Sequence, residues 1–527
     1  MGRSVVFRSP GPDVPIPRTS LTAFVFENAE RMASRPALID GPTGRVVTYA
    51  ELLNGARRLA RGLSNRGFQK GEVFGIYAPN LPEYAVAFHG VAAIGGVSTT
   101  INPSYTKEEL ARQLRDSGAR FLLTMPPLVA TARGASEGTS VEEVFAFGEA
   151  DGATPFQSLL SNDGDAPEVD IDPESDLVAL PFSSGTTGLQ KGVMLTHGNL
   201  VANLVQTAAL HERIDETDVA MGLLPFFHIY GLVVVLNLIL RHGATIVTMP
   251  RFDLEQFLSL IAKHRVTVAH VVPPIVLALS KHPIVERYDL SSLRWILSGA
   301  APLGKELIET CSRRLGFPVL QGYGLTETSP VTHGLSESDD RPGSIGRLVA
   351  GTECKVVDPS SGEALGPDKD GELWIRGPQV MKGYLNQPAA TAQVIDADGF
   401  FHSGDIGHAD DEGYFYIVDR LKELIKYKGL QVAPAELEAL LLSHPGVADA
   451  AVIPIPDEEA GEVPKAFVVP RGDVTEEALM AFVAEHVAPY KKIRALEMVD
   501  QIPKSPSGKI LRRVLVERER EKRTATT

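Results

Sequence analysis

The sequence predicts an α/β protein with a large N-terminal domain of parallel or mixed sheets covered by helices. Three observations support this prediction. Strand-like apolar runs alternate with amphipathic helical stretches, which is typical of parallel sheets. From about Gly343, short β-like runs separated by Asp-Gly and Ser-Gly turns predict a smaller β-rich subdomain. After Lys422 a compact mixed segment predicts a small α+β domain, and 527 residues are too many for a single core.

The individual elements follow from apolar spacing. In the N-terminal part, apolar residues recur with a helical period at 49–63 and 254–264, and the most apolar run, 232–240, predicts a core helix. Short apolar runs predict strands at 73–77, 177–182, 244–249 and 266–272. In the β-rich part we expect strands at 354–357, 372–375 and 414–418, and the charged tail at 517–523 predicts a solvated helix end.

Composition excludes several classes of protein. Lys and Arg number 51 against 66 Asp and Glu, so the net charge of −15 argues against nonspecific nucleic-acid binding. The two cysteines, Cys311 and Cys354, are too few for a disulfide framework or a Cys-rich zinc site. The N-terminus lacks the apolar core of a signal peptide, and 232–240 is too short to span a bilayer. We therefore expect a cytoplasmic protein without a membrane span.

The segment Ser183–Gly192, SSGTTGLQKG, is the most informative stretch of the chain. It combines hydroxyl side chains, glycines and one lysine directly after an apolar run. Glycines allow a loop to turn backbone N–H groups toward an anion, and the hydroxyls and Lys191 add further donors. The segment does not match the common P-loop, because that motif requires Gly-Lys-Ser or Gly-Lys-Thr. The alternatives are a polyphosphate cradle and a flexible surface loop, and the preceding strand and Lys191 favour the cradle.

Two further segments suit a nucleotide and its metal. In QGYGLTET, residues 321–328, the glycines permit close backbone approach and Tyr323 offers an aromatic face. Thr326 and Glu327 offer oxygen ligands, and one carboxylate beside a triphosphate is sufficient protein ligation for Mg²⁺. In SGAAP, residues 298–302, Gly299 and its two neighbouring alanines leave room for a flat base.

Three more segments carry charged residues of the same chemistry. HSGDIG contains Asp405, DRLKELIKYKGLQV contains Arg420, and PKSPSGKILRR contains Lys509. Asp accepts hydrogen bonds from a diol and Arg donates in a fixed fork, so this pair suits a ribose. Taken alone, each of these residues is more typical of a solvated charge or a surface ion pair.

Together these motifs resemble those of the adenylate-forming superfamily, which contains acyl-CoA synthetases, luciferases and adenylation domains. The motifs run in family order from residue 183 to residue 509, and TYAEL and GFQKGEVFGIYAPN extend the resemblance over nearly the whole chain. FFHIYGL at 226–232 and DRLKELIKYKGLQVAPAELE at 419–438 most resemble 4-coumarate–CoA ligases. Gln190 departs from the family, which has proline there, and we expect a more mobile loop with function kept.

The resemblance implies roles for particular residues. Lys509, His228, Lys426, Gln431, Thr326 and Glu327 would be catalytic, with Glu327 also the magnesium ligand. Lys422 would be the hinge between an AMP-binding domain, 1–421, with its β-rich subdomain at about 343–421, and a mobile lid domain, 422–527. Lys428 and Gly429 would contact coenzyme A after the lid rotates. ATP or AMP would be bound by Ser183, Ser184, Gly185, Thr186, Thr187, Gly188, Lys191, Gly299, Ala300, Ala301, Gln321, Gly322, Tyr323, Gly324, Thr326, Asp405, Arg420 and Lys509.

The implied activity is an ATP-dependent carboxylate–CoA ligase that forms acyl-AMP and then acyl-CoA, with ATP, Mg²⁺ and coenzyme A taking part. By position, the acyl pocket is expected to consist of Ile229, Tyr230, Ala300, Ala301, Gly322, Pro330 and Val331. Tyr230 could close a flat slot or donate to a ring hydroxyl, which favours a hydroxycinnamate-type acid. Gly231, Ser329, Thr332 and His333 depart from the plant enzymes, so a medium-chain fatty acid is the alternative.

Two alternatives belong to other classes. A luciferase-type monooxygenase shares the adenylation chemistry, but the chain has no peroxisomal tail and His228-Ile229-Tyr230 lacks the doubled histidine of beetle enzymes. A stand-alone adenylation protein would load a carrier protein, but no carrier segment follows residue 509. The expected partners are therefore small molecules: a carboxylic acid, ATP and coenzyme A.

Overall fold

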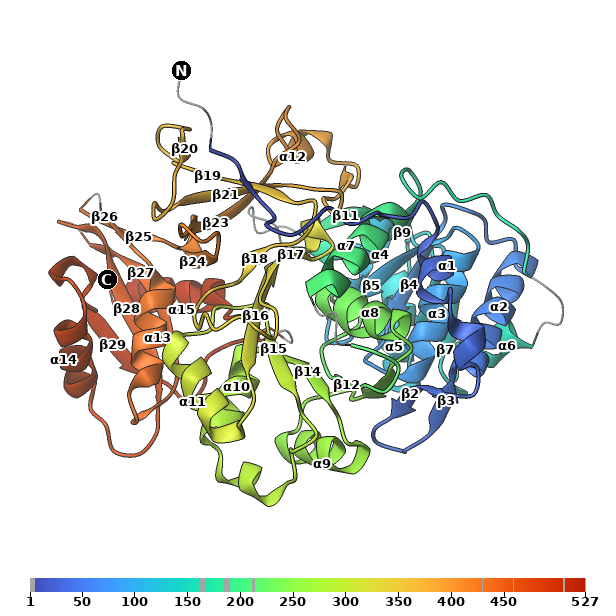
Figure 1. Ribbon diagram of the computed structural model, residues 1–527, viewed down its shortest axis with the longest axis horizontal. Helices are drawn as coiled ribbons and strands as arrows, with labels where there is room; N and C mark the ends of the chain where they lie inside the picture. Colours follow the sequence, from blue (N-terminus) through green and yellow to red (C-terminus); the bar gives the residue numbers. More distant parts are fainter. Residues whose placement is uncertain are drawn as a thin grey trace.

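The computed structural model describes residues 5–161, 166–183, 190–210, 214–428, 430–457, 459–505 and 508–526. Within them the chain forms four sheets with helices on their faces, so the predicted α/β class is confirmed (Figure 1). The α-helices are α1 Leu21–Val25, α2 Tyr49–Asn65, α3 Pro82–Ala93, α4 Lys107–Ser117, α5 Val129–Ser136, α6 Gln157–Leu160, α7 His197–Leu210, α8 Leu238–Arg241, α9 Leu254–His264, α10 Pro273–Lys281, α11 Lys305–Leu315, α12 Pro388–Ala392, α13 Pro434–Ser443, α14 Glu476–His486 and α15 Arg512–Thr526.

The first large sheet is nine-stranded and mixed. Its main order is β10-β11-β9-β5-β4-β6-β7-β8, and β22 pairs with β11. The strands are β4 Val73–Tyr77, β5 Val97–Ile101, β6 Phe121–Thr124, β7 Glu143–Ala146, β8 Thr154–Pro155, β9 Leu177–Ala179, β10 Phe182–Ser183, β11 Lys191–Thr196 and β22 Gly383–Tyr384. The strand expected at 177–182 is thus two strands, separated by Leu180 and Pro181, because proline cannot donate a ladder hydrogen bond.

The second large sheet is also nine-stranded, in the order β18-β17-β16-β15-β14-β12-β13-β2-β3. Its strands are β2 Pro36–Asp40, β3 Val46–Thr48, β12 Val219–Gly222, β13 Thr245–Thr248, β14 Val268–Val271, β15 Trp295–Ser298, β16 Val319–Gly324, β17 Val331–Gly334 and β18 Arg347–Leu348. Strands β14, β15 and β16 run parallel, so their carboxyl ends meet at one edge. That edge carries the two predicted nucleotide segments, 298–302 and 321–328.

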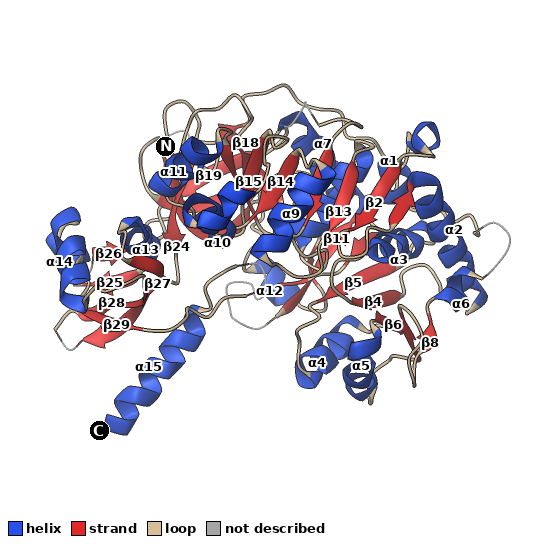
Figure 2. Cartoon of the chain, turned by 90° about the horizontal axis from the view of Figure 1, so that it is seen from below, coloured by secondary structure: helices blue, strands red, loops and turns tan. Residues whose placement is uncertain are grey.

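Helices cover the large sheets in layers. The almost wholly buried α3 lies between the two sheets, with α4 and α5 outside the first and α9, α10 and α11 outside the second (Figure 2). The apolar run expected to be a core helix is fully buried, and it forms a π-helix at Gly231–Asn237 that continues into α8. None of the helices in the described ranges is long and apolar enough to cross a membrane.

The predicted β-rich subdomain is a six-stranded sheet, β1-β19-β21-β23-β24 with β20 on β19. Its strands are β1 Phe7–Arg8, β19 Glu353–Val357, β20 Ala364–Leu365, β21 Gly371–Arg376, β23 Phe401–Ala409 and β24 Phe415–Arg420. Strand β1 comes from the N-terminus, outside the predicted range 343–421, and pairs antiparallel with β19. A pairing over such a sequence distance has no local signal.

The end of the chain forms a five-stranded sheet, β26-β25-β28-β27 with β29 on β28, beside α13, α14 and α15 (Figure 1). The strands are β25 Ile425–Tyr427, β26 Leu430–Val432, β27 Val447–Asp457, β28 Gly461–Pro470 and β29 Ala495–Met498. The expectation of a wholly solvated tail at 517–523 was wrong for Glu519. That carboxylate is buried and accepts a hydrogen bond from Lys465 Nζ at 2.6 Å, because α15 packs on β27.

Candidate functional site

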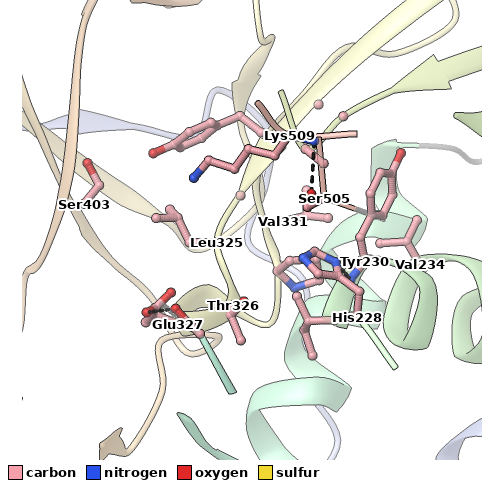
Figure 3. A pocket seen from close by; sticks show the side chains of 18 of the residues that line it. His228, Tyr230, Val234, Leu325, Thr326, Glu327, Val331, Ser403, Ser505 and Lys509 are labelled. Atoms are coloured by element: carbon pink, nitrogen blue, oxygen red, sulfur yellow. Dashed lines mark hydrogen bonds between the residues drawn. The ribbon is translucent and has the colours of Figure 1, made fainter. Parts of the chain in front are cut away.

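A cavity of about 560 Å³ lies where the two large sheets, the β-rich sheet and the C-terminal segment meet. Figure 3 shows several of its lining side chains, among them Lys509, Glu327, His228 and Tyr230. The predicted site residues that line it are Ser183, His228, Ile229, Tyr230, Gly299, Ala300, Gly322, Tyr323, Gly324, Thr326, Glu327, Pro330, Val331, Arg420 and Lys509.

A second cavity, of about 210 Å³, adjoins the first and lies between the second large sheet and the C-terminal segment. Ala301, Gln321 and Asp405 line this cavity rather than the larger one. Lys509, Arg420 and Ala300 line both, so the two cavities meet at these residues. Ala301 thus lies in the same cavity as Asp405, where the ribose is expected. Its assignment to the acyl pocket stays a prediction.

The Glu327 carboxylate is the acidic centre of the larger cavity. It is 4% exposed, and its Oε1 accepts hydrogen bonds from Ser183 Oγ at 2.8 Å and Tyr384 OH at 2.9 Å. Its other oxygen, Oε2, accepts no hydrogen bond from the residues that the structure describes. A buried carboxylate with one open oxygen suits a divalent cation that takes its remaining ligands from phosphate and water.

Lys191 lies beside this carboxylate. It begins β11, is 6% exposed, and its ammonium stands 5.2 Å from the centre of the Tyr384 ring. Burial lowers the pKa of Lys191, and the neighbouring Glu327 acts in the opposite direction. Lys191 lines neither cavity. Of the other predicted loop residues, Ser184, Gly185, Thr186, Thr187 and Gly188 lie outside the described residues.

The loop leads back into an antiparallel strand. Ser183 pairs with Lys191, so β10 and β11 are antiparallel neighbours. A regular alternation of strands and helices along the chain would instead place a helix after β10. Gln190 ends the loop, and its side-chain amide donates to the Tyr105 hydroxyl at 2.6 Å. Tyr105 belongs to the connection between β5 and α4 and also lines the cavity.

Asp405 and Arg420 face each other across strands β23 and β24. Arg420 Nε lies 2.8 Å from Asp405 Oδ1, and the Tyr323 hydroxyl donates to Asp405 Oδ2 at 2.5 Å. Burial, together with the Asp405 charge, raises the pKa of Tyr323 well above its usual value, so the phenol remains a donor. The three residues present an ordered acceptor and donor pair to the second cavity, as a sugar diol requires.

Lys509 reaches the cavity from the C-terminal segment. Its backbone N–H donates to Ser505 Oγ at 3.1 Å, and Gly508 before it has a φ of 78°, which favours glycine. Burial and then the Arg420 charge lower the pKa of Lys509. In Figure 3 the Lys509 side chain extends into the pocket across from Glu327.

His228 approaches from the start of the buried π-helix. Burial, and then the Lys509 charge, lower the pKa of His228 to about 4, so the ring is neutral near pH 7. Its Nδ1 accepts from the Tyr230 backbone N–H at 3.3 Å. A neutral imidazole can donate or accept one hydrogen bond at Nε2 without bringing charge into the cavity.

The inner end of the cavity is apolar. Tyr230, Val234, Leu297 and Leu210 contribute side chains, and Gly299 and Gly322 leave space between them. A Cβ at Gly299 would stand 2.8 Å from Tyr230 Cε1, so the missing side chain lets the ring lie against the backbone. Ala300 next to it has a φ of 70°, in the left-handed region that alanine rarely adopts.

Besides Lys191, four predicted residues in the described part of the chain line neither cavity: Lys422, Lys426, Lys428 and Gln431. Lys426 and Gln431 pair with each other on the hairpin of β25 and β26, and both are exposed. Lys428, at the turn of that hairpin, pairs with Glu459 at 2.5 Å, and Gly429 lies outside the described residues. Lys422 lies between β24 and β25, where the predicted hinge falls. In this arrangement of the chain, Lys509 is at the site and the hairpin is not.

Sequence reasoning missed several residues that face the cavity. Tyr384 is the clearest case, because it orders Glu327 although the two lie 57 residues apart. Its only local signal is an aromatic residue after a glycine, which is too common to single it out. Val234, Leu297, Leu210 and Thr207 also line the cavity, and their apolar or small side chains read as ordinary core in the sequence.

Comparison with known proteins agrees with this geometry. The model of the AMP-binding enzyme family matches residues 25–385, and that of the AMP-binding enzyme C-terminal domain matches residues 436–509. The chain is 46% identical over 528 residues to 4-coumarate–CoA ligase 1 of Solanum tuberosum, covering 97% of this chain and 96% of the relative.

Solved structures share the whole architecture. ATP-bound MatB from Rhodopseudomonas palustris superposes with a TM-score of 0.86 at 30% identity, covering 95% of this chain and 99% of that one. The o-succinylbenzoate CoA synthetase MenE of Bacillus subtilis, in complex with its acyl-adenylate intermediate OSB-AMP, gives 0.82 at 31% identity, covering 95% and 98%.

Proposed function

The chain belongs to the AMP-binding enzyme family, and from that premise we propose that it is an AMP-forming carboxylate–CoA ligase for hydroxycinnamate-type aromatic acids. The observation that carries this proposal is one cavity that joins Lys509, Glu327 and Arg420 to an apolar inner end. The charged part suits a nucleotide triphosphate, and the apolar part suits the body of an organic acid whose carboxylate lies between them.

In the first step, a carboxylate oxygen of the acid attacks the α-phosphorus of ATP, and the bond to the β-phosphate oxygen breaks with release of pyrophosphate. Two anions must approach each other, so the site has to supply positive charge in a fixed geometry. Lys509 supplies such a charge, and Arg420 with Asp405 would hold the ribose. His228 is neutral near pH 7, so it can orient the acid by a hydrogen bond without adding charge.

Glu327 would hold Mg²⁺, because it is a buried carboxylate at the cavity whose side-chain partners Ser183 and Tyr384 both donate to Oε1. When bound, the cation would neutralise charge on the phosphates. Ser183 and Tyr384 hold Oε1, so they orient the carboxylate, and Oε2 would be the oxygen offered to the cation.

In the second step, the sulfur of coenzyme A attacks the acyl carbonyl carbon, and AMP leaves with the electrons of the mixed-anhydride bond. Lys426, Gln431, Lys428 and Gly429 are proposed to serve this step. Because the described members of this set lie on an exposed hairpin away from the cavity, the proposal requires a rotation about Lys422.

The proposed acid follows from the relatives and from the apolar end of the cavity. The 46% identity to 4-coumarate–CoA ligases supports an aromatic acid, and the Tyr230 ring, which lies against Gly299 and lines the cavity, offers a flat wall that suits a planar tail. The medium-chain fatty acid remains the second candidate, because Val234, Leu297 and Leu210 make the inner end apolar.

The deciding experiment is mass-spectrometric detection of acyl-CoA after incubation with Mg·ATP, coenzyme A and a panel of cinnamic, benzoic and fatty acids. A dominant cinnamoyl- or coumaroyl-CoA supports the proposal, whereas a dominant aliphatic thioester keeps the chemistry and overturns the aromatic substrate. Adenylates without thioester would identify a carrier protein as the acceptor. Light emission with luciferin and oxygen would identify a luciferase-type activity.

The division of labour is tested with Lys509→Ala. We expect loss of adenylate formation by at least about 100-fold, because a charge that faces the developing negative charge is removed. Thioester formation from supplied acyl-adenylate should change little in Lys509→Ala. Lys426→Ala is the matched control with the reverse expectation: thioester formation falls and adenylate formation is kept. Equal loss of both half-reactions in Lys509→Ala would contradict these roles.

A further inference from the structure

We propose that Asp419 is a positioning residue that docks helix α13, and through it Lys509, in the orientation needed for adenylate formation. The inference rests on the proposed function and deepens it. It assigns a role to the acidic residue next to Arg420, which reaches the nucleotide side of the site.

Helix α13 begins without a cap of its own. Its N-cap residue is Ala433, which makes no side-chain hydrogen bond, and Pro434 follows at the first helical position. The next N–H, that of Ala435, donates to Asp419 Oδ2 at 2.9 Å. A carboxylate from strand β24 thus occupies the place of the missing cap, where an anion also interacts favourably with the positive helix end.

The Asp419 carboxylate is held firmly for this purpose. It is 4% exposed, and its Oδ1 accepts from the Arg420 backbone N–H at 2.6 Å. Because one backbone donor comes from its own strand and the other from α13, the carboxylate joins the two segments on either side of Lys422. A buried carboxylate is retained at a cost in desolvation, so a contact that orders two parts of the chain is a physical reason for its presence.

Asp419 and Arg420 are neighbours on β24 and make different contacts. Successive side chains of a strand point to opposite faces, so Asp419 faces α13 while Arg420 faces Asp405 at 2.8 Å. One strand end therefore connects the predicted ribose site to the orientation of the helix.

Helix α13 is connected in turn to Lys509. Arg512 Nη2 donates to both oxygens of Glu438 on α13, at 2.8 and 2.7 Å, and its Nη1 donates to Glu423 at 2.6 Å. Arg512 follows Lys509 by three residues and starts α15. Because the Arg512–Glu438 ion pair is largely buried and charge-assisted, it holds α13 and the Lys509 segment together.

Two other contacts hold the rest of the helix against α10 and the start of α11. Lys281 Nζ donates to the Leu442 carbonyl at 3.1 Å near the helix end, and Ala439 lies beside Gly304. Asp419 supplies the contact at the first turn. Rotation of the lid about Lys422 would break all three, so Asp419 favours the arrangement in which Lys509 lines the cavity.

The test measures the two half-reactions separately in full-length Asp419→Ala. With the acid that the unaltered protein uses best, we expect adenylate formation to slow by about tenfold or more, because a charge-assisted hydrogen bond is lost. Thioester formation from supplied acyl-adenylate should stay within about twofold or rise. Asp419→Asn, which keeps an acceptor, should recover part of the adenylation rate.

A matched second variant separates docking from helix stability. Asp419→Ala combined with Ala433→Ser gives α13 a cap of its own, so thermal stability should recover while adenylate formation stays slow. Recovery of adenylation in this double variant, or an equal loss of both half-reactions in Asp419→Ala, would overturn the inference. If the unaltered protein forms no adenylate with any acid, the proposed function fails and the inference falls with it. A normal adenylation rate in Asp419→Ala overturns the inference alone.

Discussion

Burial sets the charge of the residues that face the cavity. Burial lowers the pKa of Lys509 and of Lys191, and it lowers the pKa of His228 to about 4. Each lysine is a cation below its lowered pKa, whereas the histidine is neutral near pH 7. The site therefore offers positive charge where phosphates are expected and a neutral hydrogen-bonding group beside the apolar end.

This charge pattern predicts the pH dependence of adenylate formation. As pH rises through the lowered pKa of Lys509, the ammonium loses its proton and kcat/KM for ATP should fall. At pH 6 the pH is already above the His228 pKa of about 4. Protonation of His228 should therefore produce no acidic limb between pH 6 and pH 8. The measurement is a pH profile of pyrophosphate release.

Lys509→Arg is the control for that profile, because arginine stays protonated throughout the range. We expect its basic limb to move to higher pH, even if the overall rate is lower. An unchanged limb in Lys509→Arg would assign the titration to another group.

Gly322 offers a test of the acyl pocket at the scale of one methyl group. A Cβ there would lie 3.5 Å from the His333 carbonyl oxygen and 3.6 Å from Leu297 Cδ2, which is ordinary contact. Gly322→Ala should therefore fold normally and shorten the slot, lowering kcat/KM for the preferred acid about tenfold relative to smaller acids. Gly366→Ala, whose Cβ would meet no atom within 4 Å, is the matched control. A uniform change for large and small acids would place the acyl group elsewhere.

At the scale of elements, two antiparallel connections organise the charged part of the site. Strands β10 and β11 carry Ser183 and Lys191, and β23 and β24 carry Asp405 and Arg420. In each pair the two residues are direct cross-strand partners, so the ladder itself fixes their separation. Tyr384 joins the first of these pairs to Glu327, because β22 pairs with β11 and the Tyr384 hydroxyl donates to the Glu327 carboxylate.

The Gln190–Tyr105 hydrogen bond gives a prediction for the first of these connections. At 2.6 Å it joins Gln190, at the end of the segment predicted to bind phosphate, to the connection between β5 and α4. Gln190→Ala and Tyr105→Phe should each raise KM for ATP by about fivefold with little change in kcat, the effect of one neutral hydrogen bond. Isotope exchange between ATP and pyrophosphate measures both constants.

The double variant decides whether the two residues act together. If they do, Gln190→Ala with Tyr105→Phe should be no worse than either single variant. Additive effects would mean that each residue acts on its own, and an unchanged KM in both would show that the loop does not depend on this bond.

Element types were predictable where the periodicity is local. The strand predicted at 73–77 matches β4, and the helix predicted at 254–264 matches α9, because the apolar spacing that predicts each lies within the segment itself. The pairing of β1 with β19 and the contact of Tyr384 with Glu327 had no such signal. Both depend on segments that are far apart in the sequence and meet only in the folded chain.

At the scale of the whole molecule, the residue predicted to serve adenylate formation lies at the cavity, and the residues predicted to serve thioester formation do not. Lys509 lines the cavity while Lys426, Gln431 and Lys428 lie on the far hairpin. Contacts of α13 with Asp419 and Lys281 hold the C-terminal segment in this position. The proposed rotation about Lys422 would have to break these contacts.

Lys422→Pro tests this rotation. Proline fixes φ near −65° and so restricts a change of backbone angle at the predicted hinge. Adenylate formation should stay within about threefold, whereas thioester formation should slow by about tenfold or more, because rotation then becomes limiting. Lys422→Ala, which keeps the backbone free, should leave both rates near their original values. Slowing of both half-reactions alike in Lys422→Pro would place the hinge elsewhere.

The sequence by itself determined the α/β class, the order of the motifs and the chemical type of the residues at the site, because these depend on local periodicity and on side-chain chemistry. Its motifs also predicted that Asp405, Arg420 and Lys509 bind the same nucleotide, although a sequence gives no distances between residues. Only the tertiary structure decided which of these residues meet. The Glu327–Tyr384 contact, the apolar end of the cavity and the capping of α13 by Asp419 arise from packing between distant segments. Such contacts depend on the relative placement of whole sheets, which no single segment encodes.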